Sequence, residues 1–326
     1  MSLKPPVPDD ETLQALYGRY RRLLVAQHAT LAERLLAGNM IRSAHFLEVA
    51  ANYDCILFDA YGVLNRGPVP IAGAAATLAA LRRSGKRFFL VSNNACHSPA
   101  QILDQLRGMG FDLEEEHLVT SGMAVLSAMA DSPLRDQPYC LVGTEAGALA
   151  YAPQPERLMV NFSSGRDDIM TGDGQRAAYI LLCSDVDYHG GPQQRLVEAL
   201  LAERIRPLVM ANPDLVAPNS QGSNLWVSGL TVADLERRYG APWVGLGKPF
   251  APVFNLALER VGEVPRERIL MVGDTLETDI LGGAAMGFDT CLTLSGVLAG
   301  QRDAITVLCD RRGIRPDYIV DSIARR

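Results

Sequence analysis

Residues 269–279 read ILMVGDTLETD, and this stretch decides the fold. Four consecutive apolar residues predict a buried strand, and Gly273 predicts the turn that ends it. Two carboxylates, Asp274 and Asp279, follow that turn five residues apart. In open α/β sheets, binding and catalytic groups lie just beyond the carboxyl ends of the strands. The stretch therefore predicts a fixed pair of the hard oxygen ligands that Mg²⁺ prefers.

Three further segments carry polar side chains beside apolar runs or tight turns: ILFDAYGVL (56–64), FFLVSNN (88–94) and GLGKP (245–249). Asp59 could attack an electrophile, Ser92, Asn93 and Asn94 could hold phosphate oxygens, and Lys248 could neutralise phosphate charge. Taken singly, each has an ordinary alternative: a turn-capping Asp, a common turn sequence and a surface Lys. Their recurrence at predicted strand ends favours a shared site.

The apolar runs between residues 53 and 300 alternate with stretches of helical periodicity. Buried strands are predicted at 55–58, 88–91, 139–142, 179–183, 208–210, 269–272 and 290–294. Helices are predicted between them at 73–84, 98–110, 192–203 and 252–261. This order predicts an α/β fold with a mostly parallel, Rossmann-type sheet and helices on both faces. Residues 1–50 are predicted to form a helical N-terminal extension, starting after Asp9 or Asp10.

Composition and charge argue against several classes of protein. The chain has 326 residues, of which 48% are hydrophobic and 21% charged, as in a soluble protein with material for two domains. A net charge of −6, without a basic patch, argues against a nucleic-acid partner. We see neither a secretory signal nor the ~18 uninterrupted apolar residues of a membrane span. Six scattered cysteines without a CxxC pair predict free thiols in the cytoplasm.

Taken together and in this order, the four motifs resemble those of the haloacid dehalogenase superfamily. The resemblance covers roughly residues 53–300, and more than 150 residues separate the Ser-Asn-Asn and Lys motifs. That interval contains ANPD (211–214) and is similar to class IIA, whose members include nitrophenyl, phosphoglycolate and pyridoxal phosphatases. The resemblance implies a large α/β cap at 136–241 inserted into a core of residues 51–135 and 242–326. It also suggests a homodimer through the cap.

The resemblance implies a role for each motif residue. Asp59 would be the nucleophile that attacks phosphorus, forming an aspartyl-phosphate. Mg²⁺ would be held by Asp59, the backbone carbonyl of Tyr61 and Asp274, with Asp279 supporting the metal shell. The phosphoryl group would be bound by Ser92, Asn93 and Lys248, with Asn94 close by. The implied activity is Mg²⁺-dependent hydrolysis of a small phosphorylated metabolite. The ANPD segment is expected to fix the junction of cap and core.

The sequence departs from the phosphatase pattern at one position. Phosphatases of this superfamily carry an Asp two residues after the nucleophile, where it protonates the leaving group and then activates water. Tyr61 stands there, and a phenol with a reference pKa of ~10 is a poor general base at neutral pH. The departure, with the N-terminal extension, resembles a class IIA subgroup with Trp or Tyr at this position and no assigned substrate.

Three interpretations of Tyr61 remain open. A phosphatase with a weakened or altered acid is favoured, because the metal and lysine motifs are intact. A non-catalytic phosphate-ester and metal-binding protein is the first alternative. The second is dehalogenase-type chemistry, because Asp-x-Tyr-Gly is similar to the first motif of the 2-haloacid dehalogenases.

Overall fold

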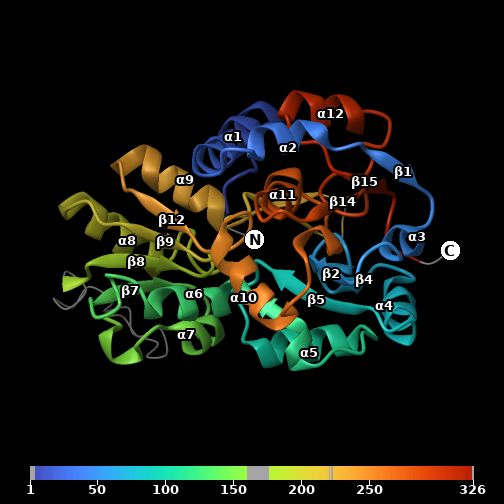
Figure 1. Cartoon of the computed structure of the whole chain (residues 1–326). Coiled ribbons are helices and arrows are strands. Elements are labelled where there is room, and N and C mark those ends of the chain that lie inside the picture. The colour runs from blue at the N-terminus through green and yellow to red at the C-terminus, as the bar shows by residue number, and fades with distance from the viewer. Residues whose placement is uncertain (1–3, 160–175, 220, 222, 325–326) are drawn as a thin grey trace.

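The computed structural model describes residues 4–159, 176–219, 221 and 223–324. It contains two parallel sheets, each covered by helices (Figure 1). The larger sheet has seven strands in the order β1-β15-β14-β13-β2-β5-β6, and the smaller has four in the order β12-β9-β8-β7. Neighbouring strands within both sheets pair in parallel. The predicted fold class, an α/β core with a second α/β unit inserted, is confirmed.

The larger sheet consists of β1 (Ile41–Ser43), β2 (Cys55–Phe58), β5 (Arg87–Ser92), β6 (Leu118–Thr120), β13 (Ile269–Gly273), β14 (Asp289–Thr293) and β15 (Tyr318–Val320). The smaller sheet consists of β7 (Tyr139–Val142), β8 (Tyr179–Leu182), β9 (Leu208–Met210) and β12 (Trp243–Gly245). Two hairpins pair β3 (Asn65–Arg66) with β4 (Val69–Pro70) and β10 (Val216–Pro218) with β11 (Asn224–Trp226).

The α-helices are α1 (Asp10–Gln27), α2 (Leu31–Ala37), α3 (Phe46–Ala50), α4 (Ala74–Arg83), α5 (Pro99–Gly108), α6 (Ser121–Ala130), α7 (Glu145–Tyr151), α8 (Pro192–Glu203), α9 (Ser228–Tyr239), α10 (Ala251–Val261), α11 (Leu281–Ala285) and α12 (Ile305–Arg312). A π-helical turn, η6 (Leu276–Ile280), links β13 to α11.

The central strands of the core sheet are buried on both faces, which explains their continuous apolar runs. Strand β2 is wholly buried and alternates between two hydrophobic clusters. Ile56 and Phe58 pack with side chains of α4 and α5, whereas Cys55 and Leu57 pack with α10. The residue that follows β2 is therefore held by a strand packed tightly on both sides.

The smaller sheet extends beyond the cap boundary predicted from sequence. Strand β12 pairs with β9, so Trp243–Gly245 belongs to this sheet, although the cap was expected to end at residue 241. The run is only three residues long and leads directly to Lys248, which made it look like part of the lysine motif. The other boundaries of the proposed cap and core remain predictions.

The N-terminal segment is more than a helical extension. Helix α1 begins as expected after Asp9, whose side chain accepts a hydrogen bond from the Thr12 backbone N–H at 2.8 Å. Strand β1, however, pairs with β15 and forms an edge of the core sheet. Its three residues, Ile41–Ser43, carry no apolar run because the strand is largely exposed. Only the pairing with a strand almost 280 residues away reveals it.

All six cysteines are free, and five of them are buried. Within the described part of the chain, no helix combines the length and apolar character needed to cross a membrane.

Leu57→Ala should destabilise the fold by about 2–5 kcal/mol, because it leaves a cavity in the central strand that precedes Asp59. Urea unfolding followed by circular dichroism would measure the loss. The matched control is Leu225→Ala on β11, where the leucine is 48% exposed and the expected change is within about 0.5 kcal/mol. Equal losses in the two variants would contradict the assignment of β2 to the core.

Candidate active site

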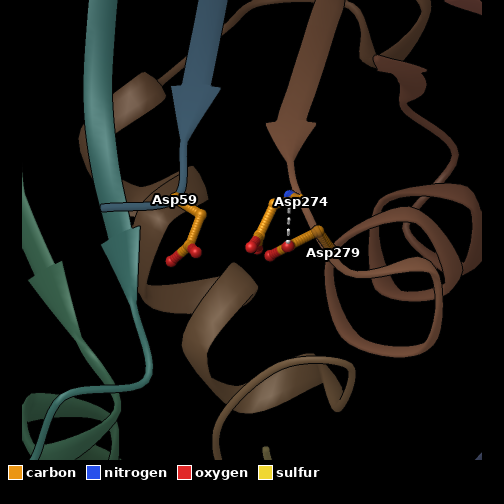
Figure 2. Close-up of side chains that lie close together, drawn as sticks. All are labelled: Asp59, Asp274 and Asp279. Carbon is orange, nitrogen blue, oxygen red and sulfur yellow. Dashed lines mark hydrogen bonds between the residues drawn. The ribbon is translucent and has the colours of Figure 1, made fainter. Parts of the chain in front are cut away.

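The site lies where the carboxyl ends of β2 and β13 meet (Figure 2). Asp59 follows β2, and its backbone N–H donates to the Val272 carbonyl of β13 at 2.9 Å. Asp274 follows β13, and Asp279 lies in the turn η6. One carboxylate oxygen from each of the three aspartates lies within 4.8 Å of the others. The structure thus brings together the three predicted acidic residues, which are up to 220 positions apart in sequence.

Lys248 joins two of these aspartates. Its Nζ donates to Asp59 Oδ1 at 2.6 Å and to Asp279 Oδ1 at 2.7 Å, and the lysine side chain is only 1% exposed. Burial alone would lower the pKa of Lys248, but the surrounding carboxylates, led by Asp279, raise it above its usual value. The ammonium therefore stays charged inside the protein.

Backbone donors and a glycine fix the acidic residues after β13. Asp279 Oδ2 accepts from the backbone N–H groups of Asp274 and Thr275, both at 3.1 Å, and Asp274 Oδ2 accepts from Val297 N at 2.6 Å. Gly62 has φ of +82°, and a Cβ there would lie 2.0 Å from Asp274 Oδ2. Glycine is thus required sterically as well as conformationally for the Asp274 carboxylate to reach this position.

Excess negative charge governs the electrostatics of the site. Burial raises the pKa of Asp59 to about 7, against the lowering effect of Lys248, and the Asp279 charge raises it further. Burial also raises the pKa of Asp274 well above its usual value, with additional contributions from Asp59 and Asp279. Three carboxylates thus face one ammonium, and this arrangement favours binding of an additional cation.

The Ser-Asn-Asn segment at the end of β5 holds the lysine segment in place. Asn93 Oδ1 accepts from Lys248 N at 2.8 Å, and Asn93 Nδ2 donates to the Lys248 carbonyl at 3.1 Å. Ser92 Oγ accepts from Asn94 N at 3.2 Å, while Asn94 Oδ1 accepts from Cys96 N at 2.9 Å. The Asn93 side chain is therefore engaged with the backbone of Lys248, a role that sequence reasoning did not predict.

Tyr61 lies close to Asp59 but offers no carboxylate. Its side chain is partly buried, and the interactions that affect it involve Cys96 and Asp59. Burial, followed by the charges of these two neighbours, raises the pKa of Tyr61 above its usual value. The phenol is therefore protonated at neutral pH and cannot act as a general base.

Asp214 is an additional acidic residue at the site, and it comes from the cap. Burial raises the pKa of Asp214 to about 6. The Lys248 charge and hydrogen bonding by the side chains of Asn93 and Thr278 act in the opposite direction. The sequence analysis assigned the segment around Asp214 to the cap–core junction, with at most an indirect role. The ANPD motif marked the residue, but only the structure shows that its loop lies against the lysine motif, where a Cβ on Gly247 would come within 2.5 Å of the Ala211 carbonyl oxygen.

Comparisons with known proteins agree with this arrangement. Residues 56–152 match a family model described as haloacid dehalogenase-like hydrolase, and residues 245–325 match a second, described as HAD-hydrolase-like. The chain is 30% identical over 299 residues to a glycerol-3-phosphate phosphatase from Gallus gallus, covering 85% of this chain and 91% of the relative.

Two solved structures extend the likeness. A possible sugar phosphatase from Cytophaga hutchinsonii has a TM-score of 0.73 and 28% identity, and the match covers 88% of this chain and all of that one. A glycerol phosphate phosphatase from Mycobacterium tuberculosis, solved with calcium, has a TM-score of 0.65 and 26% identity, covering 84% and 75% respectively. With the four motifs gathered around one site and relatives matched along most of its length, the chain belongs to the haloacid dehalogenase-like hydrolases.

Proposed function

We propose that this protein is a Mg²⁺-dependent phosphatase that acts on small phosphomonoesters through an aspartyl-phosphate at Asp59. The observation that carries the proposal is the contact of Lys248 with both Asp59 and Asp279 beside Asp274. The names of the relatives, which act on glycerol 3-phosphate, support a small phosphorylated metabolite as substrate.

The donor set suits a divalent cation. Asp59, Asp274 and Asp279 supply hard anionic oxygens within 4.8 Å of one another, and the single positive charge of Lys248 does not balance them. In this proposal Asp59, Asp274 and the backbone carbonyl of Tyr61 hold Mg²⁺, and Asp279 supports it. Bound Mg²⁺ would neutralise phosphate charge next to the nucleophile.

The residues of this chain have separate roles in the proposed reaction. The carboxylate of Asp59 attacks phosphorus, the P–O bond to the leaving group breaks, and an acyl phosphate forms. Lys248, with Ser92 and Asn93, binds the phosphoryl oxygens and offsets the repulsion between a phosphate dianion and a carboxylate. Water then attacks the acyl phosphate, which releases inorganic phosphate and regenerates Asp59.

Tyr61 determines which leaving groups are tolerated. Because a phenol with a raised pKa is a weak acid, it gives little help in protonating an alkoxide. Aryl and acyl phosphates leave as weaker bases and need little protonation. We therefore infer a preference for substrates with acidic leaving groups.

Asp59→Asn should lower Mg²⁺-dependent phosphate release from p-nitrophenyl phosphate by roughly 10⁴-fold or more, because the amide cannot form the acyl phosphate. Removal of Mg²⁺ with EDTA should have a similar effect on the unsubstituted protein. The matched control is Asp54→Asn at the opposite end of β2, where the side chain is 52% exposed and activity should persist. Tight binding of the ester without any turnover would instead favour a phosphate-ester-binding protein.

Tyr61→Asp should increase kcat/KM for glycerol 3-phosphate by about 10²–10⁴, because a carboxyl group can protonate an alkoxide leaving group. The same change should matter much less for p-nitrophenyl phosphate. Tyr61→Phe, which removes only the hydroxyl, should keep the preference for the aryl ester. If the unsubstituted protein hydrolyses both esters with equal efficiency, the weakened-acid hypothesis is wrong.

A further inference from the structure

The N-terminal segment lies against both the cap and the core. In Figure 1, α1 lies between α9 of the cap and α12 of the core. Arg19 on α1 makes two hydrogen bonds of 2.5 Å to Glu236 on α9. Before the helix, Lys4 Nζ donates to Asp185 Oδ1 at 3.0 Å and to the Trp226 carbonyl at 2.9 Å, both in the cap. One face of the segment therefore binds the cap.

The same helix is anchored to the core beside the acidic turn η6. Arg312 Nη2 donates to Asp10 Oδ1 at 3.0 Å, while Arg312 Nη1 donates to Glu277 Oε1 at 2.6 Å. Arg21 Nε donates to the Gly313 carbonyl at 3.2 Å. Glu277 is 3% exposed and lies two residues before Asp279. Helix α1 thus has a fixed position relative to the part of the core that carries the proposed metal ligands.

Two buried tyrosines of α1 form hydrogen bonds with the backbone of the cap loop that carries Asp214. The Tyr20 hydroxyl donates to the Pro213 carbonyl at 2.9 Å, and the Tyr17 hydroxyl accepts from Leu215 N at 3.1 Å. These contacts flank Asp214 on both sides in sequence. Both tyrosine side chains are 4% exposed, so water does not replace the hydrogen bonds readily.

Tyr20 also packs behind the lysine motif. Its ring contacts Trp243 and Phe250 edge-on, with centroid distances of 5.6 and 5.3 Å. Trp243 lies in β12, and Phe250 comes two residues after Lys248. A single helix therefore supports both the loop of Asp214 and the loop of Lys248, whose charges interact across the site.

We infer that Tyr17 and Tyr20 are positioning residues of the active site, and that α1 holds the loop of Asp214 and the loop of Lys248 in place so that the ammonium keeps its orientation. The inference rests on the proposed phosphatase function only for its kinetic consequence. Its structural consequence is that the hydroxyls of both tyrosines protect the cap loop that carries Asp214, and that the ring of Tyr20 protects the lysine motif.

Tyr17→Phe and Tyr20→Phe remove the hydroxyls and keep the rings. Tyr179→Phe is the matched control, because Tyr179 is fully buried and its hydroxyl has no hydrogen-bond partner among the described residues. Amide hydrogen exchange would be followed by mass spectrometry in peptides covering residues 211–216 and 246–250. We expect exchange at residues 211–216 to rise roughly five- to tenfold in the two α1 variants and to stay unchanged in the control. Exchange at residues 246–250 should rise in Tyr20→Leu, which removes the ring that contacts Phe250, and not in Tyr20→Phe.

Kinetics with p-nitrophenyl phosphate and Mg²⁺ provide the second measurement. Each α1 variant should lower kcat by roughly five- to tenfold and change KM less, because a misplaced ammonium stabilises the transition state poorly. If Tyr17 acts through Asp214, adding Asp214→Asn to Tyr17→Phe should lower kcat no further than the stronger single variant. Fully additive losses would overturn the inference.

The two measurements separate failure of the inference from failure of the proposed function. If the unsubstituted protein releases no phosphate, the phosphatase proposal is wrong, and the exchange experiment alone decides whether α1 holds the two loops. If Tyr179→Phe raised exchange at residues 211–216 as much as the α1 variants do, or if Tyr20→Leu left exchange at residues 246–250 unchanged, α1 would not hold the two loops.

Discussion

The buried ammonium of Lys248, bound to Asp59 and Asp279, is the interaction on which the rest of the site depends. Removing a charge from water costs several kcal/mol, and only close opposite charges with good hydrogen bonds compensate for it. Such compensation requires fixed geometry. Asn93 therefore binds both the backbone N–H and the backbone carbonyl of Lys248, and backbone N–H groups after β13 hold Asp279.

The parallel sheet provides this geometry because neighbouring strands end at the same edge. Strands β2 and β13 are paired, so Asp59 and Asp274 meet without any special loop. Lys248 comes from the segment between β12 and α10, where the smaller sheet gives way to the core. Both sheets thus contribute charged residues to the site. A change in how the sheets pack would move Lys248 relative to the aspartates.

Much of this could be predicted from sequence, for identifiable reasons. The buried strands β2, β5 and β13 are continuous apolar runs, and Asp59 and Asp274 follow such runs directly. The short strands β1 and β12 were not predicted, because neither is a continuous run of three apolar residues and each is defined by pairing with a partner elsewhere in the chain. Asp214 was underestimated for a related reason. Its position beside Lys248 depends on how the cap loop folds over the core, which no local pattern encodes.

Tyr61 separates two requirements that are usually met together at such a site. Bringing a carboxylate to a phosphate dianion depends on positive charge. The residues that would supply that charge or hold a cation are buried together: Lys248, Asp59, Asp274 and Asp279. In the proposed mechanism, protonating the leaving group depends on one acid, and the residue at that position is a phenol with a raised pKa. The substrate cannot supply the positive charge. It can, however, remove the need for protonation if its leaving group is acidic. A site of this composition is therefore better suited to select its substrates by leaving group than to lose the chemistry altogether.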